Sequence, residues 1–191
     1  MSRLVVINHL TLDGVMQAPG RADEDPRGGF EHGGWAIPNN DEVMGQAIGR
    51  HMVGGPLLLG RVTYEALYAY WPHQTDNPFT EALNRTQKYV VSTTLTELPW
   101  VNSTLVSGDA AAAVAELKER SDQDIVVLGS GELIQTLRQH DLIEEYLLLI
   151  HPLVLGSGRR MFPEGGAKGA LQLVDSVAST KGVVIATYRP A

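Results

Sequence analysis

The chain has 191 residues, of which 43% are hydrophobic and 19% charged, the composition of a globular domain large enough to bury a core of its own. Its formal net charge of −7, without any lysine- or arginine-rich run, argues against a nucleic acid or an anionic membrane as partner. Cysteine is absent, which excludes disulfides, thiolate metal sites and a cysteine nucleophile. The first apolar stretch is too short to span a membrane and lacks a signal-peptide pattern, so we expect a cytoplasmic protein.

The first half of the chain predicts strands that alternate with helices. Residues 4–10 form a nearly continuous apolar run, typical of a strand buried on both faces. Residues 17–40, rich in Gly, Pro and charge, predict a long surface segment. The next predicted elements are a helix capped by Asn39, Asn40 or Asp41 and running to about Met52, a strand at 57–59, a helix through 66–68, a helix around 79–85 and a strand at 88–93.

The second half continues the alternation and ends differently. The predicted elements are a brief strand near Leu105, a helix from Asp109 to about Arg120, a strand at 125–128, a helix after Gly131, a strand at 146–151, and two strands at about 171–179 and 182–189. The last two form an antiparallel hairpin. We therefore predict one α/β domain over residues 1–191, with a mostly parallel sheet, helices on both faces and an antiparallel edge.

Three of the predicted strands end in loops that suit an anionic ligand. Gly60-Arg61-Val62-Thr63, Ser92-Thr93 and Gly129-Ser130-Gly131 each follow a strand, and ligands of open α/β sheets bind at the carboxyl ends of strands. The free amides at a helix start bind anions, and a guanidinium such as that of Arg61 suits bidentate contact with a terminal phosphate. Together the loops predict a nucleotide site, with Arg61 favouring NADP over NAD.

Other chemistries lack their sequence signals. There is no Gly-x-Ser-x-Gly elbow and no Walker loop, and Ile134 stands where the third glycine of a Gly-x-Gly-x-x-Gly fingerprint would fall. Metal-ligand spacing is absent from the histidines, so we expect no metal site. The six histidines are His9, His32, His51, His73, His140 and His151.

The order of short motifs resembles the dihydrofolate reductase superfamily, and most closely the branch that contains the RibD C-terminal domain, the reductase domain of bacterial riboflavin biosynthesis. The motifs are Leu12-Asp13-Gly14, Leu59–Glu65, Lys88–Ser92, Leu128–Leu133, Leu142–Tyr146, Pro152–Gly158 and Met161-Phe162. They span nearly the whole chain in the expected order.

The resemblance implies a mainly parallel sheet of about eight strands, NADPH as hydride donor, and a homodimer. The implied cofactor-binding residues are Gly60, Arg61, Thr63, Ser92, Thr93, Gly129, Ser130, Gly131, Glu132 and Leu133. The implied substrate-side residues are Asp13, Gly14, Trp35, Asn40, Gly156 and Gly158. The riboflavin enzyme is typically fused to a zinc deaminase with His and Cys ligands. This sequence has no cysteine and no such domain, so we expect a stand-alone reductase here.

One departure from the pattern concerns the catalytic acid. Dihydrofolate reductases place a carboxylate two residues after the proline of a Trp-x-x-Pro segment, which Trp35-Ala36-Ile37-Pro38 resembles. That position is Asn40 here, and Asp41 comes one residue later, about 100° further round a helix. Folate reduction is therefore disfavoured. Asp41 and Asp13 are the candidate catalytic residues, although Asp41 also suits a helix start, where a carboxylate stabilises the dipole.

The leading hypothesis is an NADPH-dependent reductase that transfers a hydride to a small polar heterocycle or a sugar-linked imine, similar to 5-amino-6-(5-phosphoribosylamino)uracil reductase. The alternatives are a reductase of another small carbonyl or pterin substrate, an NADP(H)-binding protein without turnover, and a ligand-free structural homodimer. A phosphoribosyl substrate needs a second phosphate site. Its candidates are Arg21, Arg27, Arg159 and Arg160.

Overall fold

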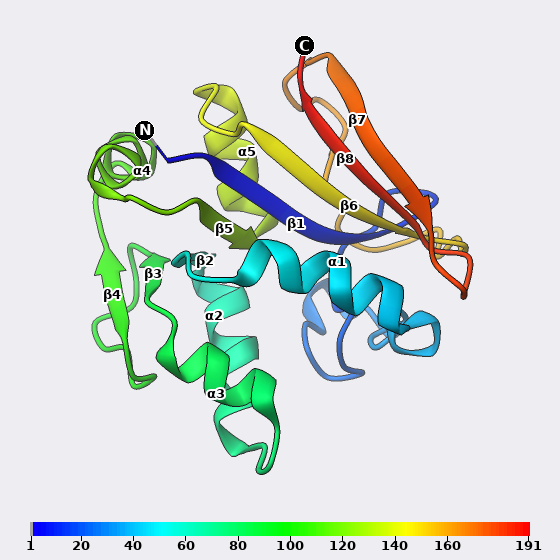
Figure 1. Ribbon diagram of the computed structural model, residues 1–191, viewed down its shortest axis with the longest axis horizontal. Helices are drawn as coiled ribbons and strands as arrows, with labels where there is room; N and C mark the ends of the chain where they lie inside the picture. The colour runs from blue at the N-terminus through cyan, green and yellow to red at the C-terminus, as the bar shows by residue number, and fades with distance from the viewer. Residues whose placement is uncertain (1) are drawn as a thin grey trace.

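The strands of the computed structural model, which describes residues 2–191, form a single eight-stranded sheet in the order β4-β3-β2-β5-β1-β6-β8-β7 (Figure 1). They are β1 (Leu4–Thr11), β2 (Leu57–Gly60), β3 (Lys88–Val91), β4 (Ser103–Val106), β5 (Ile125–Leu128), β6 (Glu145–His151), β7 (Leu171–Ala178) and β8 (Val184–Pro190). The first six pair in parallel, and β8 is antiparallel to both β6 and β7. The predicted fold class, with its antiparallel hairpin at one edge, is confirmed.

Helices cover both faces of the parallel part of the sheet. The helices are α1 (Glu42–Met52), α2 (Arg61–Tyr68), α3 (Pro78–Arg85), α4 (Ala110–Arg120) and α5 (Gly131–Gln139), with 3-10 turns η1 (Arg27–Gly29), η2 (Ile37–Asn39) and η3 (Trp71–His73). Successive strand residues face opposite ways, so Val5 and Ile7 of β1 pack toward α1, α2 and α3, whereas Leu4 and Val6 pack toward α4 and α5. This two-sided burial explains the unbroken apolar run at 4–10.

Local side-chain chemistry sets the element boundaries. Asp41 caps α1 by accepting from the Met44 amide at 2.9 Å, and Asp109 caps α4 in the same way. β3 ends at Val91, two residues earlier than the predicted strand. The reason is the hydroxyl of Ser92, which accepts hydrogen bonds from two later amides and folds the chain into a turn.

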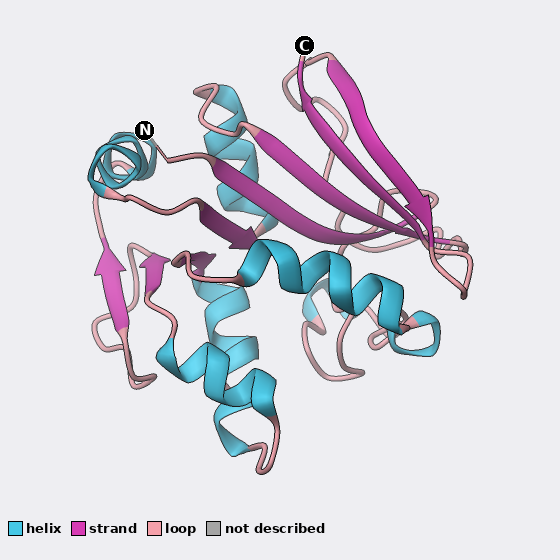
Figure 2. Cartoon of the chain, viewed as in Figure 1, coloured by secondary structure: helices cyan, strands magenta, loops and turns pink. Residues whose placement is uncertain are grey.

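The hairpin of β7 and β8 extends beyond the helices at one side of the molecule (Figure 2). Every residue of β7 is exposed, including Leu171, Leu173, Val174 and Val177. An edge strand with bare apolar side chains on both faces is unusual for an isolated chain. None of the helices in residues 2–191 is long and apolar enough to cross a membrane.

Candidate cofactor and substrate site

The turns that follow β2 and β5 are tied to each other. Gly129 and Ser130 both have left-handed backbone angles, with φ of 54° and 58°. The Ser130 amide donates to the hydroxyl of Thr63 at 2.9 Å, and the Ser130 hydroxyl accepts from the Gly60 amide at 2.9 Å while donating to the Leu128 carbonyl. These reciprocal bonds lock two of the three predicted phosphate loops into one rigid unit.

The first turn of α5 opens directly onto this unit. Helix geometry leaves the amides of Gly131, Glu132 and Leu133 without partners inside the helix, so they form the positive end of its dipole. The Leu133 side chain is buried in the core, so only its backbone can meet a ligand. Asn8 on β1 donates to the carbonyl of Gly129 at 3.3 Å and so fixes the turn against the neighbouring strand. The arrangement can hold a pyrophosphate.

Arg61 and the loop after β3 complete this edge, because β3 pairs with β2. Arg61 is the first residue of α2, and its half-exposed guanidinium lies 3.0 Å from Glu65 one helical turn later. The hydroxyl of Ser92 already binds amides of its own turn, whereas the side chain of Thr93 is exposed. The exposed side chain of Thr93 and that of Arg61, whose partner Glu65 is itself exposed, are therefore the groups that can turn toward a terminal phosphate.

Asp13 organises the other end of the site. Its carboxylate accepts from the Thr11 hydroxyl at 2.6 Å and from the amides of Leu155 and Gly156, which belong to the loop after β6. These bonds, the Thr11 hydroxyl foremost, lower its pKa to about 2. Gly14 makes the intervening turn with φ of 80°. Asp13 is thus an ionised anchor between two loops and has no proton to donate near neutral pH.

We expect Asp13→Asn to lower the free energy of unfolding by about 1–3 kcal/mol, because an amide cannot accept all these bonds. Asp23→Asn, at an exposed ion pair, serves as control and should change it by less than about 0.5 kcal/mol. Because the folded-state pKa of about 2 lies below the ordinary 3.8, the carboxylate stabilises the fold fully above 3.8 and loses this effect as pH falls toward 2. Urea unfolding of both variants at neutral and acid pH measures this, and equal losses in the two variants would contradict the anchor role.

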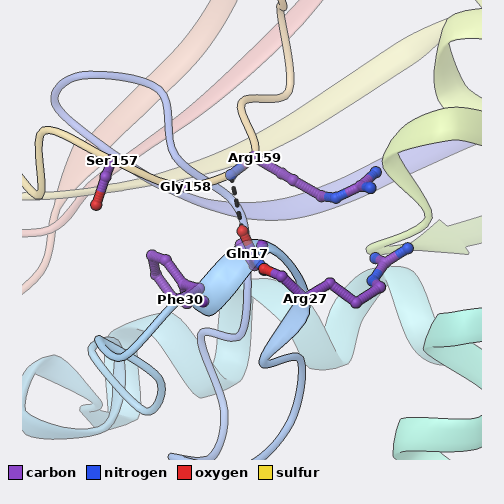
Figure 3. A pocket seen from close by; sticks show the side chains of 8 residues that line it. Gln17, Arg27, Phe30, Ser157, Gly158 and Arg159 are labelled. Carbon is purple, nitrogen blue, oxygen red and sulfur yellow. Dashed lines mark hydrogen bonds between the residues drawn. The ribbon is translucent and has the colours of Figure 1, made fainter.

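A hollow of about 370 Å³ lies where the 17–30 segment meets the loop after β6 (Figure 3). Gly158 belongs to its wall, and a Cβ there would lie only 2.7 Å from Phe30 and Val15. Gly158, with φ of 115°, therefore permits the close approach of the two segments. Gly156, by contrast, donates its amide to Asp13 and faces open space.

Two of the four arginines considered for a second phosphate, Arg27 and Arg159, border this hollow, and Figure 3 shows their side chains extending in the same direction. Arg27 is paired with Asp25 and Arg159 with Glu132, both at 2.6 Å. The Glu132 side chain thus ties the start of α5 to the hollow. The other two arginines bind carbonyl groups elsewhere: Arg21 that of Ala66, and Arg160 that of Asp13.

No carboxylate of α1 faces the substrate side among the described residues. One carboxylate oxygen of Asp41 accepts from the Met44 amide and the other accepts from the Thr180 hydroxyl at 2.7 Å. These bonds lower the pKa of Asp41 to about 2. Asn40 is exposed, and the residue turned inward is Asn39. The 3-10 turn that ends at Asn39 shifts the chain by one position relative to the expected pattern.

Two histidines, not singled out by the sequence, lie near the ends of β1 and β6, His9 partly buried and His151 fully buried. His9 Nδ1 lies 2.9 Å from His151 Nε2, and Asn39 Nδ2 lies 3.4 Å from His151 Nδ1. Trp35, whose indole N–H donates to a backbone carbonyl, packs edge-on against His151 with ring centroids 5.2 Å apart. The sequence signal for this pair is that each histidine lies near the end of a predicted strand. The sheet order then makes the two strands neighbours.

Residues 3–185 match the model of the RibD C-terminal domain. The uncharacterized protein YyaP of Bacillus subtilis is 30% identical over 69% of this chain and 72% of its own length. A pyrimidine reductase-like protein from Corynebacterium diphtheriae superposes with a TM-score of 0.66 at 11% identity, covering 100% of this chain and 92% of its own. Dihydrofolate reductase from Enterococcus faecalis, solved with NADP(H), gives 0.65 at 13%, covering 98% and 96%. The structures share the fold, and the family match over nearly the whole sequence shows that the chain belongs to the RibD C-terminal domain family of reductase-like proteins.

Proposed function

We propose that this protein is an NADPH-dependent reductase that transfers a hydride to a small polar heterocycle or a sugar-linked imine, as in riboflavin biosynthesis. The observation that carries the proposal is the rigid unit formed by the turns after β2 and β5 at the open end of α5. Family membership supports a reductase, and the Enterococcus faecalis enzyme of the same fold was solved with NADP(H).

The residues fit a dinucleotide because backbone, rather than side chains, lines the turn. A Cβ on Gly129 would lie 2.9 Å from the Thr63 hydroxyl, and one on Gly131 would lie 2.8 Å from the Met16 sulfur. The α5 amides would hold a pyrophosphate, and Arg61 the additional phosphate of NADPH. When bound, NADPH would supply the hydride, and the protein would contribute binding, orientation and exclusion of water.

The substrate would lie on the side of Trp35, Asp13 and the hollow bordered by Arg27 and Arg159. The two arginines offer contacts for a phosphorylated sugar once they exchange their acidic partners for the ligand. Because Asp13 and Asp41 are both ionised, water is the proton source in this proposal.

The decisive test compares NADPH with NADH. We expect Arg61→Ala to weaken NADPH binding roughly 10- to 100-fold and to leave NADH binding nearly unchanged, since hydrogen bonds to charged groups contribute about 1.5–3 kcal/mol. Arg120→Ala is the control, because Arg120 also forms an i,i+4 ion pair, with Glu116 in the reverse order on α4. Tryptophan fluorescence titration gives the dissociation constants, and equal affinity of the wild type for both cofactors would refute the role of Arg61.

A second candidate is an NADP(H)-binding protein without turnover. It is favoured by the absence of an inward carboxylate on α1 among the described residues. Loss of NADPH absorbance against a panel of aminouracils, pterins, quinones and aldehydes separates the two functions, because only the reductase consumes the cofactor.

We also propose that the protein is a homodimer in which a second copy covers the β7–β8 hairpin. The support is the exposure of the whole of β7 together with Val184 of β8. Symmetric pairing of one surface with itself is the commonest form of soluble oligomer.

A further inference from the structure

The histidine pair forms a hydrogen-bonded chain with a defined direction. An amide NH2 group only donates, so from the contact of Asn39 Nδ2 we assign His151 Nδ1 as the acceptor and the His151 proton to Nε2. That proton is then donated to His9 Nδ1, 2.9 Å away. His9 must therefore carry its own proton on Nε2, at the end of the hydrogen-bonded series that begins at Asn39.

His9 Nε2 is open to a ligand. It has no hydrogen-bond partner, and Ser103 Oγ is the one buried side-chain polar atom left unpaired in residues 2–191. The unpaired His9 Nε2 is therefore accessible rather than sealed in the core. By contrast, His151 is completely buried between His9, Asn39 and Trp35.

His9 lies on β1, the strand next to β5, and the candidate cofactor turn follows β5. His9 follows Asn8, which binds the carbonyl of Gly129, and β1 lies between β5 and β6. His9 and His151 are on the α1 side of the sheet, as Ile7 and Leu149 are. This is the side on which Trp35 and Asn39 approach the strand ends.

Both imidazoles are neutral near neutral pH. Burial lowers the pKa of His9 to about 3, with a smaller contribution from His151, and burial lowers the pKa of His151 to about 4. A neutral imidazole with its proton on Nε2 offers a hydrogen-bond donor without a charge. It is too weak an acid to release that proton to a substrate.

We propose that His9 Nε2–H is a neutral hydrogen-bond donor that recognises a carbonyl oxygen of the substrate, with His151 and Asn39 as positioning residues. This rests on the proposed function, in which a polar heterocycle binds beside the cofactor. It selects a 2,4-dioxopyrimidine, whose groups at C2 and C4 accept hydrogen bonds, over a 2,4-diaminopyrimidine, whose groups at the same positions donate them.

The first experiment follows the imidazole nitrogens of the histidine-labelled full chain by NMR, with and without NADPH. From about pH 6 to 8, His9 and His151 should both remain neutral with protons on Nε2. Adding 5,6-diaminouracil should shift the His9 Nε2 signal. His9→Phe should weaken the binding of 5,6-diaminouracil about tenfold and should leave the NADPH dissociation constant within about twofold of the wild-type value.

Asn39→Asp tests the direction of the hydrogen bonds from Asn39 through His151 to His9, and it leaves both imidazole rings in place. At about pH 8 the new carboxylate accepts from His151 Nδ1, so His151 Nε2 becomes an acceptor, and the proton of His9 moves to Nδ1. His9 Nε2 then accepts, and the preference for 5,6-diaminouracil over 2,4-diaminopyrimidine should fall about tenfold or reverse. Gln46→Glu, on the exposed face of α1, is the control for the added charge and should retain the preference.

The proposal is overturned if the wild type binds 5,6-diaminouracil no better than 2,4-diaminopyrimidine, or if Asn39→Asp and Gln46→Glu behave alike. It is also overturned if His9→Phe binds the dioxo probe as the wild type does. Failure of NADPH to bind would refute the proposed function instead, because both probes are titrated against the cofactor-free protein as well.

Discussion

Replacing Gly129 with alanine is expected to weaken NADPH binding by at least about 100-fold, the largest loss we expect from any single methyl group. The φ of Gly129 is 54°, where a Cβ is strained, and the added Cβ would lie 2.9 Å from the Thr63 hydroxyl. That hydroxyl accepts a hydrogen bond from the Ser130 amide. A shift of Thr63 away from the added Cβ therefore breaks the bond that joins the two turns. The α5 amides would then no longer be held against the loop of Gly60.

Gly108→Ala is the matched control for backbone strain. Gly108 has φ of 87°, but a Cβ there meets no atom within 4 Å. Both variants should lose about 1 kcal/mol of folding free energy through strain, and only Gly129→Ala should also lose the cofactor. Fluorescence titration with NADPH, together with urea unfolding, separates the two effects. Unchanged NADPH affinity in folded Gly129→Ala would refute the cofactor site.

The fold was predictable because local patterns and global topology agree. The apolar run at 4–10 implies a strand covered on both faces, and the structure covers it with helices on each side. Asp109 and the periodic Leu133, Ile134 and Leu137 mark helices that the structure contains. The hairpin follows from two apolar runs around a short turn. Each of these signals is local, and each is reinforced by the packing.

The site was only partly predictable because its contacts are made between distant parts of the chain. The glycine turns are local features, and the structure brings those of Gly60 and Ser130 together. The Leu155 and Gly156 amides that Asp13 binds lie 142 and 143 residues away, so its role as an anchor between two loops has no local signal. The inward position of Asn39 depends on a 3-10 turn, and the pairing of His9 with His151 depends on strand order.

The second large effect concerns the β7–β8 hairpin. We expect the wild type to sediment as a dimer and Leu173→Glu to sediment as a monomer, with dimer affinity lowered by at least about 100-fold. Leu173 is 51% exposed and is paired with Tyr188 on the face that α4 and α5 leave uncovered at this edge. In a two-fold dimer each substitution occurs twice, so two carboxylates enter one apolar contact.

Val53→Glu is the control for this substitution, because Val53 is 80% exposed and follows α1, away from the hairpin. It should sediment as the wild type does. A dimer also predicts that thermal stability of the wild type rises with protein concentration, and Leu173→Glu should remove that dependence. A wild type that is monomeric at high micromolar concentration would refute the proposed dimer. The exposed β7 would then have to be stabilised by the β8 pairing alone, against the cost of keeping Leu171, Leu173 and Val177 in water.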